Sequence, residues 1–193
     1  HLMAPWGFLD DAWFNRSFWI YGDIWPGFYL GNSAARAGQL VVVGPEKTFS
    51  MNAYPNRNLQ SPLPSDKGYL VMADSNETKP RLRPEAQGTP KGFGFKRTAE
   101  PVWFTWTPVR VRGMVLAGDR LYMAGPPGAQ MVKNPRAAMQ GRKGAILQSV
   151  SADDGKKLSR RRLDSAPVHD GLIAAGGRLY MSTLDGTVMC LGK

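Results

Sequence analysis

Apolar and polar residues alternate along short stretches of this chain, and glycine-containing turns separate the stretches. Alternation with a period of two is typical of half-buried β-strands. The clearest example is a twelve-residue segment that occurs twice, at 113–124 and at 171–182, with seven identical positions. Each copy has a central Ala-Gly pair, where a tight turn needs a residue that tolerates positive φ. The pattern predicts two β-hairpins that repeat one structural unit.

Further strands follow from the same pattern, and we group them into three blade-like units of four antiparallel strands. Twelve short strands joined by close turns favour an all-β fold over helices or a parallel sheet. The units span about 16–73, 99–151 and 156–191. Their predicted strands are 16–21, 38–43, 47–52 and 68–73; 99–106, 109–117, 119–124 and 144–151; and 156–163, 168–175, 178–183 and 186–191.

Four long segments interrupt the strands, and their Pro, Gly and aromatic content is typical of loops. They are 22–37, 53–67, 78–98 and 125–143. Within the last, Asn134 and Pro135 predict the cap of a short helix that ends at Gly141. Because successive strands run up and down, we expect 78–98 at one end of the blades and the other three loops together at the opposite end.

Aromatic and basic side chains on these three loops form a candidate partner-binding face. Rings stack on sugars or peptides, and arginine binds carboxylates or sulfates. The alternative is that the rings attach the long loops to the blades. The candidate residues are Trp25, Phe28, Tyr29, Tyr54, Arg57, Arg136 and Arg142.

Charge adds one alternative to this picture. The formal net charge is +10, and a basic run lies on the predicted strand 156–163: Lys156, Lys157, Arg160, Arg161 and Arg162. A basic surface permits binding to nucleic acid or acidic glycans. The same residues on an edge strand also prevent pairing with other sheets. No apolar run reaches the roughly 18 residues needed to cross a bilayer.

Residue types that carry catalysis or hold metals are sparse. The chain has one cysteine, Cys190, and two histidines, His1 and His169, which excludes an internal disulfide and a histidine-based metal centre. Cys190 lies in an apolar alternation, and we expect it to be a small buried residue. The pairs 10–11 and 153–154 are two adjacent aspartates each; the second lies in a Gly-containing turn, where Asp hydrogen-bonds the backbone. We therefore expect no catalytic residue, cofactor or metal within this chain.

The segments 150–158, 170–171, 177–180, 185–186 and 190–192 together resemble the PQQ-like (pyrroloquinoline-quinone-like) propeller repeat. Quinoprotein alcohol dehydrogenases and outer-membrane assembly lipoproteins share this repeat. The resemblance extends over about 98–193 and, more weakly, over 36–75. It implies a PQQ-like β-propeller of which this chain holds about three blades, with the remaining blades of a larger protein as partners.

Four further segments, 7–11, 13–16, 19–22 and 141–144, look like large secreted bacterial proteins of this superfamily. Asn15 stands where those proteins commonly have histidine, so this chain departs from their pattern at that position. This resemblance implies an extracytoplasmic location, either periplasmic or secreted.

Three functions remain open at this point. The first is a non-catalytic binding or scaffold propeller whose long-loop face contacts a protein or glycan. The second is part of a quinoprotein-type oxidoreductase that holds PQQ and Ca²⁺ through residues outside this chain, because the adjacent cysteine pair and the acidic Ca²⁺ ligands are missing from this sequence. The third is a basic module that binds polyanions.

Overall fold

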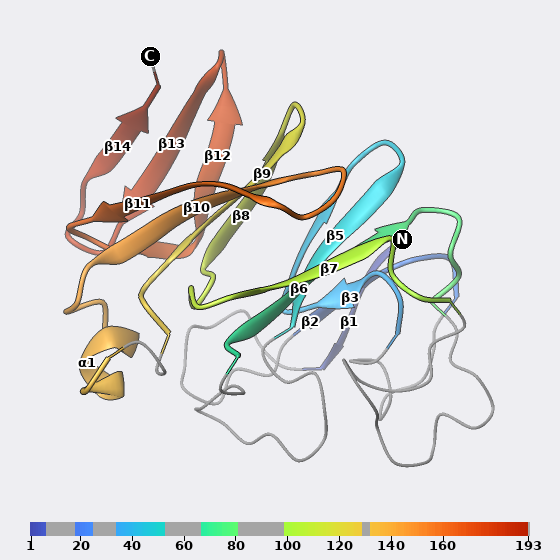
Figure 1. The fold of residues 1–193 in the computed structure, drawn as a ribbon, viewed down its shortest axis with the longest axis horizontal. Coiled ribbons are helices and arrows are strands. Elements are labelled where there is room, and N and C mark those ends of the chain that lie inside the picture. Colours follow the sequence, from blue (N-terminus) through green and yellow to red (C-terminus); the bar gives the residue numbers. More distant parts are fainter. Residues whose placement is uncertain (7–17, 25–33, 53–66, 81–98, 129–131, 193) are drawn as a thin grey trace. The chain divides into compact units, whose positions relative to one another are not determined.

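The computed structural model describes residues 1–6, 18–24, 34–52, 67–80, 99–128 and 132–192, and the structural statements below concern these ranges. Within them the protein is all-β, with four antiparallel sheets and one short helix. The chain divides into two compact units (Figure 1). Unit 1 comprises residues 1–65 and 69–106, and unit 2 comprises residues 66–68 and 107–193.

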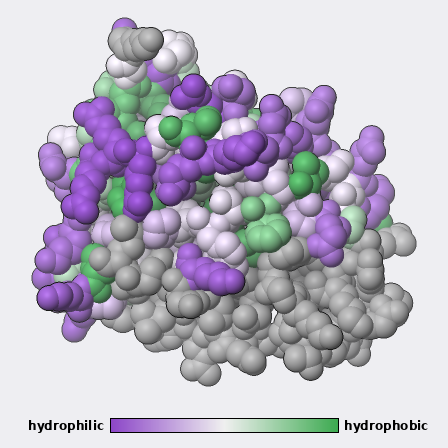
Figure 2. Space-filling view, in the orientation of Figure 1, coloured by the Kyte–Doolittle hydropathy of each residue, from purple (hydrophilic) through white to green (hydrophobic). Residues whose placement is uncertain are grey.

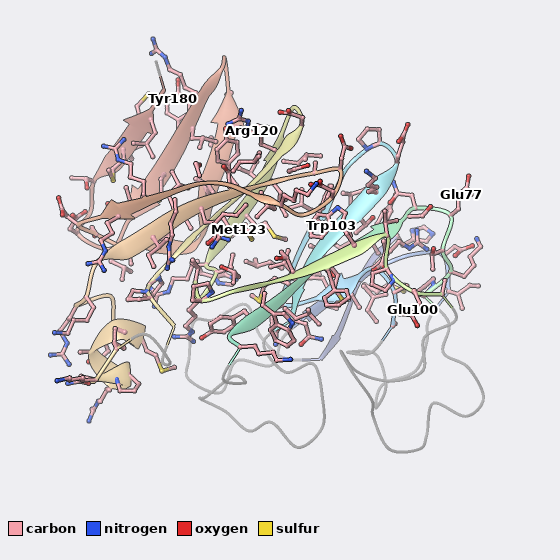
Figure 3. The ribbon with its side chains drawn as sticks, in the orientation of Figure 1. Glu77, Glu100, Trp103, Arg120, Met123 and Tyr180 are labelled. Carbon is pink, nitrogen blue, oxygen red and sulfur yellow. The ribbon has the colours of Figure 1, made fainter. Side chains whose placement is uncertain are left out.

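Unit 1 contains a three-stranded and a four-stranded sheet. The first has the order β1 (Leu2–Trp6), β2 (Phe18–Tyr21) and β3 (Ala37–Gly38); the second has the order β4 (Leu40–Val43), β5 (Lys47–Asn52), β6 (Tyr69–Ser75) and β7 (Trp103–Thr107). Phe49 and Trp103 of the four-stranded sheet are both buried, with their ring centroids 5.8 Å apart; Trp103 is labelled in Figure 3.

Unit 2 also contains two sheets, which are built around the sequence repeat. The four-stranded sheet has the order β11 (Lys157–Leu163), β10 (Ala145–Ser151), β9 (Arg120–Gly125) and β8 (Gly113–Ala117); the three-stranded sheet has the order β12 (Pro167–Ala175), β13 (Arg178–Thr183) and β14 (Val188–Leu191). The helix α1 (Pro135–Met139) lies between β9 and β10 in the chain.

Both copies of the repeat are β-hairpins, which confirms the prediction. Ala117 pairs with Arg120 in the first copy and Ala175 with Arg178 in the second. The turns contain Gly118 at φ 61° and Gly176 at φ 56°, a backbone conformation that side chains with a Cβ disfavour. The alternation and the glycines therefore locate these turns to the residue.

The grouping of strands into sheets differs from the prediction. β11 pairs with β10, so the sheet runs from 113 to 163, and the first strand predicted for the unit 156–191 belongs instead to the sheet of the unit 99–151. The reason is the tight turn 152–155, which ends at Gly155 with φ 72° and makes β10 and β11 a hairpin. β7 likewise continues the sheet of β6.

The predicted strand 38–43 is also divided between two sheets. Gly38 pairs with Trp19 in the first sheet of unit 1, whereas Leu40 pairs with Met51 in the second. A Cβ on Gly38 would lie 2.5 Å from the carbonyl oxygen of Met51, so glycine leaves room for the chain to cross here from the first sheet to the second. β1 was not predicted as a strand.

The two sheets of unit 2 pack face to face through β8 and β12, which lie side by side (Figure 1). The backbones approach closely: a Cβ on Gly113 would lie 2.7 Å from the Cβ of Leu172, and the Asp170 N–H donates to the Arg112 carbonyl at 2.7 Å. Apolar side chains fill the space between the sheets. The buried members are Ala124, Ala145, Leu163, Ala166, Leu172, Leu179 and Met181.

Gly113→Ala tests this close approach. The added methyl group would force β8 and β12 apart, and overpacking of this kind destabilises a core by about 1–3 kcal/mol. We expect a free energy of unfolding that is lower by this amount, measured by urea unfolding followed by circular dichroism. An unchanged unfolding midpoint would show that the sheets are not held at this separation.

Candidate binding surface of unit 2

The segment between β9 and β10 forms a short capped helix, as predicted. The Asn134 Oδ1 atom accepts a hydrogen bond from the Ala137 N–H at 3.0 Å, and Pro135 occupies the first turn, where its missing N–H costs nothing. Gly141 at φ 77° ends the helical region. A Cβ at Gly141 would lie 2.6 Å from Leu184 Cδ1, so the β13–β14 turn packs directly against the end of α1.

Arg112 attaches this loop to both sheets. Its guanidinium donates to the carbonyl of Met139 at 2.8 Å and to that of Pro167 at 3.4 Å, and only 4% of the residue is exposed. Met139 ends α1 and Pro167 begins β12, while Arg112 itself directly precedes β8. One buried side chain therefore fixes the position of residues 132–144, which we call the α1 loop. Nothing in the local sequence pattern distinguished this arginine.

Exposed cations lie on the α1 loop itself. Arg136 lies on the helix, and Arg142 lies just after it and donates to Gln140 Oε1 from Nη2 at 2.5 Å and from Nε at 3.2 Å. Lys133 and Lys143 are also exposed. Because the backbone that carries these side chains is capped and held by Arg112, the positive charges stand on an ordered loop.

A cavity of about 440 Å³ opens beside these residues. Lys143, Arg162 and Asp164 supply its charged groups, and Pro127, Val132, Ile146 and Leu163 contribute its apolar wall. Two cations against one carboxylate favour an anionic group of a ligand. We call the exposed cations of the α1 loop, together with this cavity, the α1 surface.

The basic run extends along β11, where Lys157 to Arg162 are exposed. Lys156 is paired with Asp154 at 2.7 Å. Hydrophilic side chains gather over β11 in the space-filling view (Figure 2). Residues 107–193 contain 14 Lys and Arg against 6 Asp and Glu, a net charge of +8 out of the chain's +10. The positive charge of the chain is thus concentrated on unit 2.

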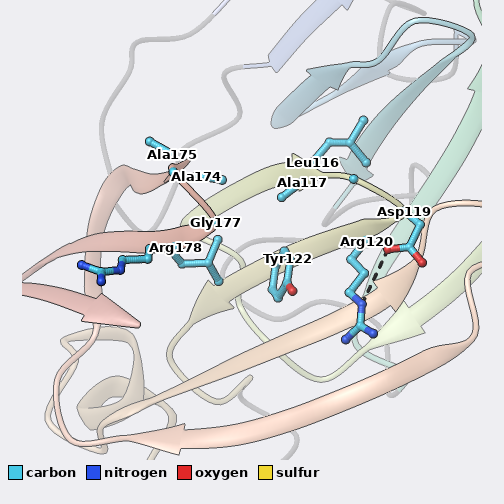
Figure 4. A pocket seen from close by; sticks show the side chains of 12 residues that line it. Leu116, Ala117, Asp119, Arg120, Tyr122, Ala174, Ala175, Gly177 and Arg178 are labelled. Carbon is cyan, nitrogen blue, oxygen red and sulfur yellow. Dashed lines mark ion pairs between the residues drawn. The ribbon is translucent and has the colours of Figure 1, made fainter. Parts of the chain in front are cut away.

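A second depression lies at the opposite end of the strands, between the two repeated hairpin turns. It measures about 500 Å³ and is lined by residues 116–120 and 174–179 with Tyr122. Arg120 and Arg178 lie on opposite sides of it, and Arg120 Nε is 3.7 Å from Asp119 Oδ1 (Figure 4). The two guanidinium groups do not converge on one point, so this end offers a less organised site than the α1 surface.

The remaining predicted site residues are placed as follows. Arg136 and Arg142 share the α1 surface, whereas Trp25, Phe28, Tyr29, Tyr54 and Arg57 lie outside the described residues. The pair 10–11 also lies outside them, and so do most of the loops 22–37, 53–67 and 78–98. The predicted common face of the loops 22–37, 53–67 and 125–143 therefore stays a prediction.

The aspartate turn 153–154 is structural, as expected: Asp154 Oδ1 accepts from the Lys156 N–H at 3.1 Å. The pKa of Asp154 is lowered to about 2 by its hydrogen bonds, first of all with the Lys156 side chain. Cys190 is exposed, so its predicted burial is wrong. Its neighbours Met189 and Leu191 face the core, and Cys190 therefore points to the other side of β14.

In the described part of the chain, no three His, Cys, Asp or Glu side chains lie close enough together to hold a metal ion. Among the residues that the structure describes, no helix is long and apolar enough to span a membrane. Comparison of the sequence with protein-family models and with curated proteins found no match.

Arg112→Ala tests the attachment of the α1 loop. The carbonyls of Met139 and Pro167 would lose a charged donor, and hydrogen bonds to charged groups contribute about 1.5–3 kcal/mol each. We expect a lower free energy of unfolding and faster hydrogen exchange in 132–144. Arg142→Ala is the matched control, an exposed arginine of the same loop, and should change stability by less than about 0.5 kcal/mol. Equal exchange rates in the two variants would contradict the role of Arg112.

Asp185 gives the adjoining β13–β14 turn a pH dependence. Its Oδ1 accepts from the hydroxyl of Thr183 at 2.6 Å and from that of Thr187 at 2.5 Å, and these bonds lower its pKa from 3.8 to about 2. Because the folded-state pKa lies below the unfolded one, the ionised carboxylate stabilises the fold above about pH 4, and this contribution is lost as the pH falls toward 2. The wild-type protein should therefore lose its stability advantage over Asp185→Asn across this range in urea unfolding. A constant difference between the two would contradict this assignment.

Proposed function

We propose that the chain is a non-catalytic binding or scaffold module built of PQQ-like β-propeller sheets, and that its α1 surface contacts an anionic group of a protein or glycan. The observation that carries the proposal is the ordered display of cations on the α1 loop. Arg136, Arg142 and Lys143 stand on backbone that Arg112 holds, beside a cavity that Arg162 also lines. A preformed site of this kind loses less conformational entropy when a ligand binds.

The propeller assignment rests on the internal repeat. Antiparallel sheets that pack face to face, each built on one copy of a sequence repeat, are typical of blades, and unit 2 has one such sheet of four strands and one of three. Within such an array the ends of the strands carry the loops, and loops on a rigid scaffold are the usual place for binding residues. The α1 surface lies at such an end. The extracytoplasmic location belongs to the same proposal.

A second candidate function is the binding of polyanions along β11. It is favoured by the exposed basic run of that strand and by the net charge of +8 on residues 107–193. In this case charge density would decide affinity, and the identity of the polymer would matter little. The two candidates therefore predict different residues as the contact.

Three variants that each remove two positive charges separate the candidates. Arg136→Ser/Arg142→Ser alters the α1 surface, Lys157→Ser/Arg161→Ser alters β11, and Arg120→Ser/Arg178→Ser is the control at the opposite end of unit 2. Heparin and polyglutamate serve as probes of sulfated glycan and acidic protein. The readouts are binding by fluorescence anisotropy and its dependence on salt.

The proposed function predicts that the first variant alone loses affinity for at least one probe. Removing two contact cations should reduce the slope of log K against log salt by about 1.5, since each contact contributes roughly 0.7–0.9. If the β11 variant loses more affinity, for both probes alike, the polyanion candidate is preferred. If all three variants lose affinity equally, both assignments of a surface are wrong.

A further inference from the structure

The two sheets of unit 2 have equivalent faces, because the hairpins β8–β9 and β12–β13 are copies of one sequence. Position 115 corresponds to 173, position 122 to 180, and position 124 to 182. The third strands correspond through their register: Leu147 pairs with Ala124 as Val188 pairs with Ser182, and Ser149 pairs with Tyr122 as Cys190 pairs with Tyr180. The positions of β8, β9 and β10 therefore have counterparts on β12, β13 and β14, whereas β11 has none.

In the first sheet this face is covered. Val115, Tyr122 and Leu147 pack against the cluster that contains Leu172, Leu179 and Met181 of the second sheet. Ala124 and Ser149 on the same face are 0% exposed. The cover consists of the inner face of β12–β14, which is apolar and without charge at these positions.

In the second sheet the equivalent face is uncovered. Ile173 is 59% exposed and Val188 is 68% exposed, and Ser182 and Cys190 are exposed as well. Ile173 pairs with Tyr180 and Tyr180 with Cys190, so these side chains form one row across the three strands. Tyr180 is labelled in Figure 3. Single exposed apolar side chains are common on protein surfaces, whereas a contiguous row of them marks an interaction site.

We propose that the outer face of β12–β14 binds a further β-sheet of the same repeat. The occupant is defined by the contact already present in unit 2: an antiparallel hairpin that presents aliphatic and thioether side chains where Leu172, Leu179 and Met181 stand. The residue types of the two faces support this, since Val115, Tyr122 and Leu147 are replaced by Ile173, Tyr180 and Val188. This surface is distinct from the α1 surface, and the proposal does not depend on the binding of an anionic partner.

The chain supplies its own probe of the occupant. Residues 167–184 form the hairpin β12–β13, and Pro167 pairs with Thr183, so the ends of this segment are neighbours and can be joined head to tail. The resulting cyclic peptide carries the Leu172, Leu179 and Met181 face and contains no cysteine. A control peptide carries Leu179→Lys and Met181→Lys.

Cys190 reports on the face, because it is the single cysteine of the chain and lies in the exposed row. We measure its rate of reaction with a disulfide reagent (DTNB) in the full chain while the cyclic peptide is added. The expected result is a saturable loss of Cys190 reactivity, because a covered thiol is inaccessible to the reagent. The control peptide should leave the rate for the wild-type chain unchanged. In the Ile173→Lys chain, adding the original cyclic peptide should also leave the Cys190 rate unchanged. Val43→Lys, at a 45% exposed position of β4, should be protected like the wild type.

Three results would overturn the proposal. The first is an unchanged rate at all concentrations of a peptide whose hairpin is verified by NMR. The second is equal protection of the Ile173→Lys chain; if that variant fails to fold, Val188→Lys replaces it. The third is protection that rises with protein concentration in the absence of peptide, which would make a second copy the occupant.

Discussion

Unit 2 depends on the contact between β8 and β12. The missing Cβ of Gly113 lets Leu172 approach, and the hydrogen bond from Asp170 to the Arg112 carbonyl fixes the two strands at that separation. Sheets that pack face to face gain most of their stability from the side chains that interdigitate between them. The same contact sets Arg112 beside Pro167 and Met139, so the position of the α1 loop follows from the spacing of the sheets.

Each unit contains, within itself, a buried arginine at a point where a loop meets a strand. Arg36 in unit 1 and Arg112 in unit 2 are each 4% exposed, and each donates to backbone carbonyls, Arg36 to Asn76 at 2.8 Å. The ring of Tyr21 also lies 5.4 Å from the Arg36 guanidinium. A charge this deeply buried is tolerated only when hydrogen bonds replace its hydration, so removing the partners costs more than the bonds themselves. Loops anchored in this way keep a defined conformation without an apolar core of their own.

The sequence predicted local features better than the assembly of strands. Hairpin turns at Gly118 and Gly176 and the cap at Asn134 were predictable, because positive φ and an unsatisfied helix end each demand particular residue types. The partner of β11 depends on whether the turn 152–155 closes a hairpin or joins two sheets, and alternation is identical in both cases. Arg112 gave no signal at all, because its role arises only from segments far apart in the chain.

The wrong expectation for Cys190 has a physical explanation that bears on function. Alternation predicts that one face of a strand is apolar, but burial is conferred by whatever packs on that face. Ser149 and Cys190 occupy equivalent positions, and one is buried while the other is exposed. The α1 surface lies at the ends of the strands, whereas Cys190 lies on the face of a sheet. The two proposed surfaces therefore involve different residues of unit 2, one set on the face of a sheet and the other at the ends of strands.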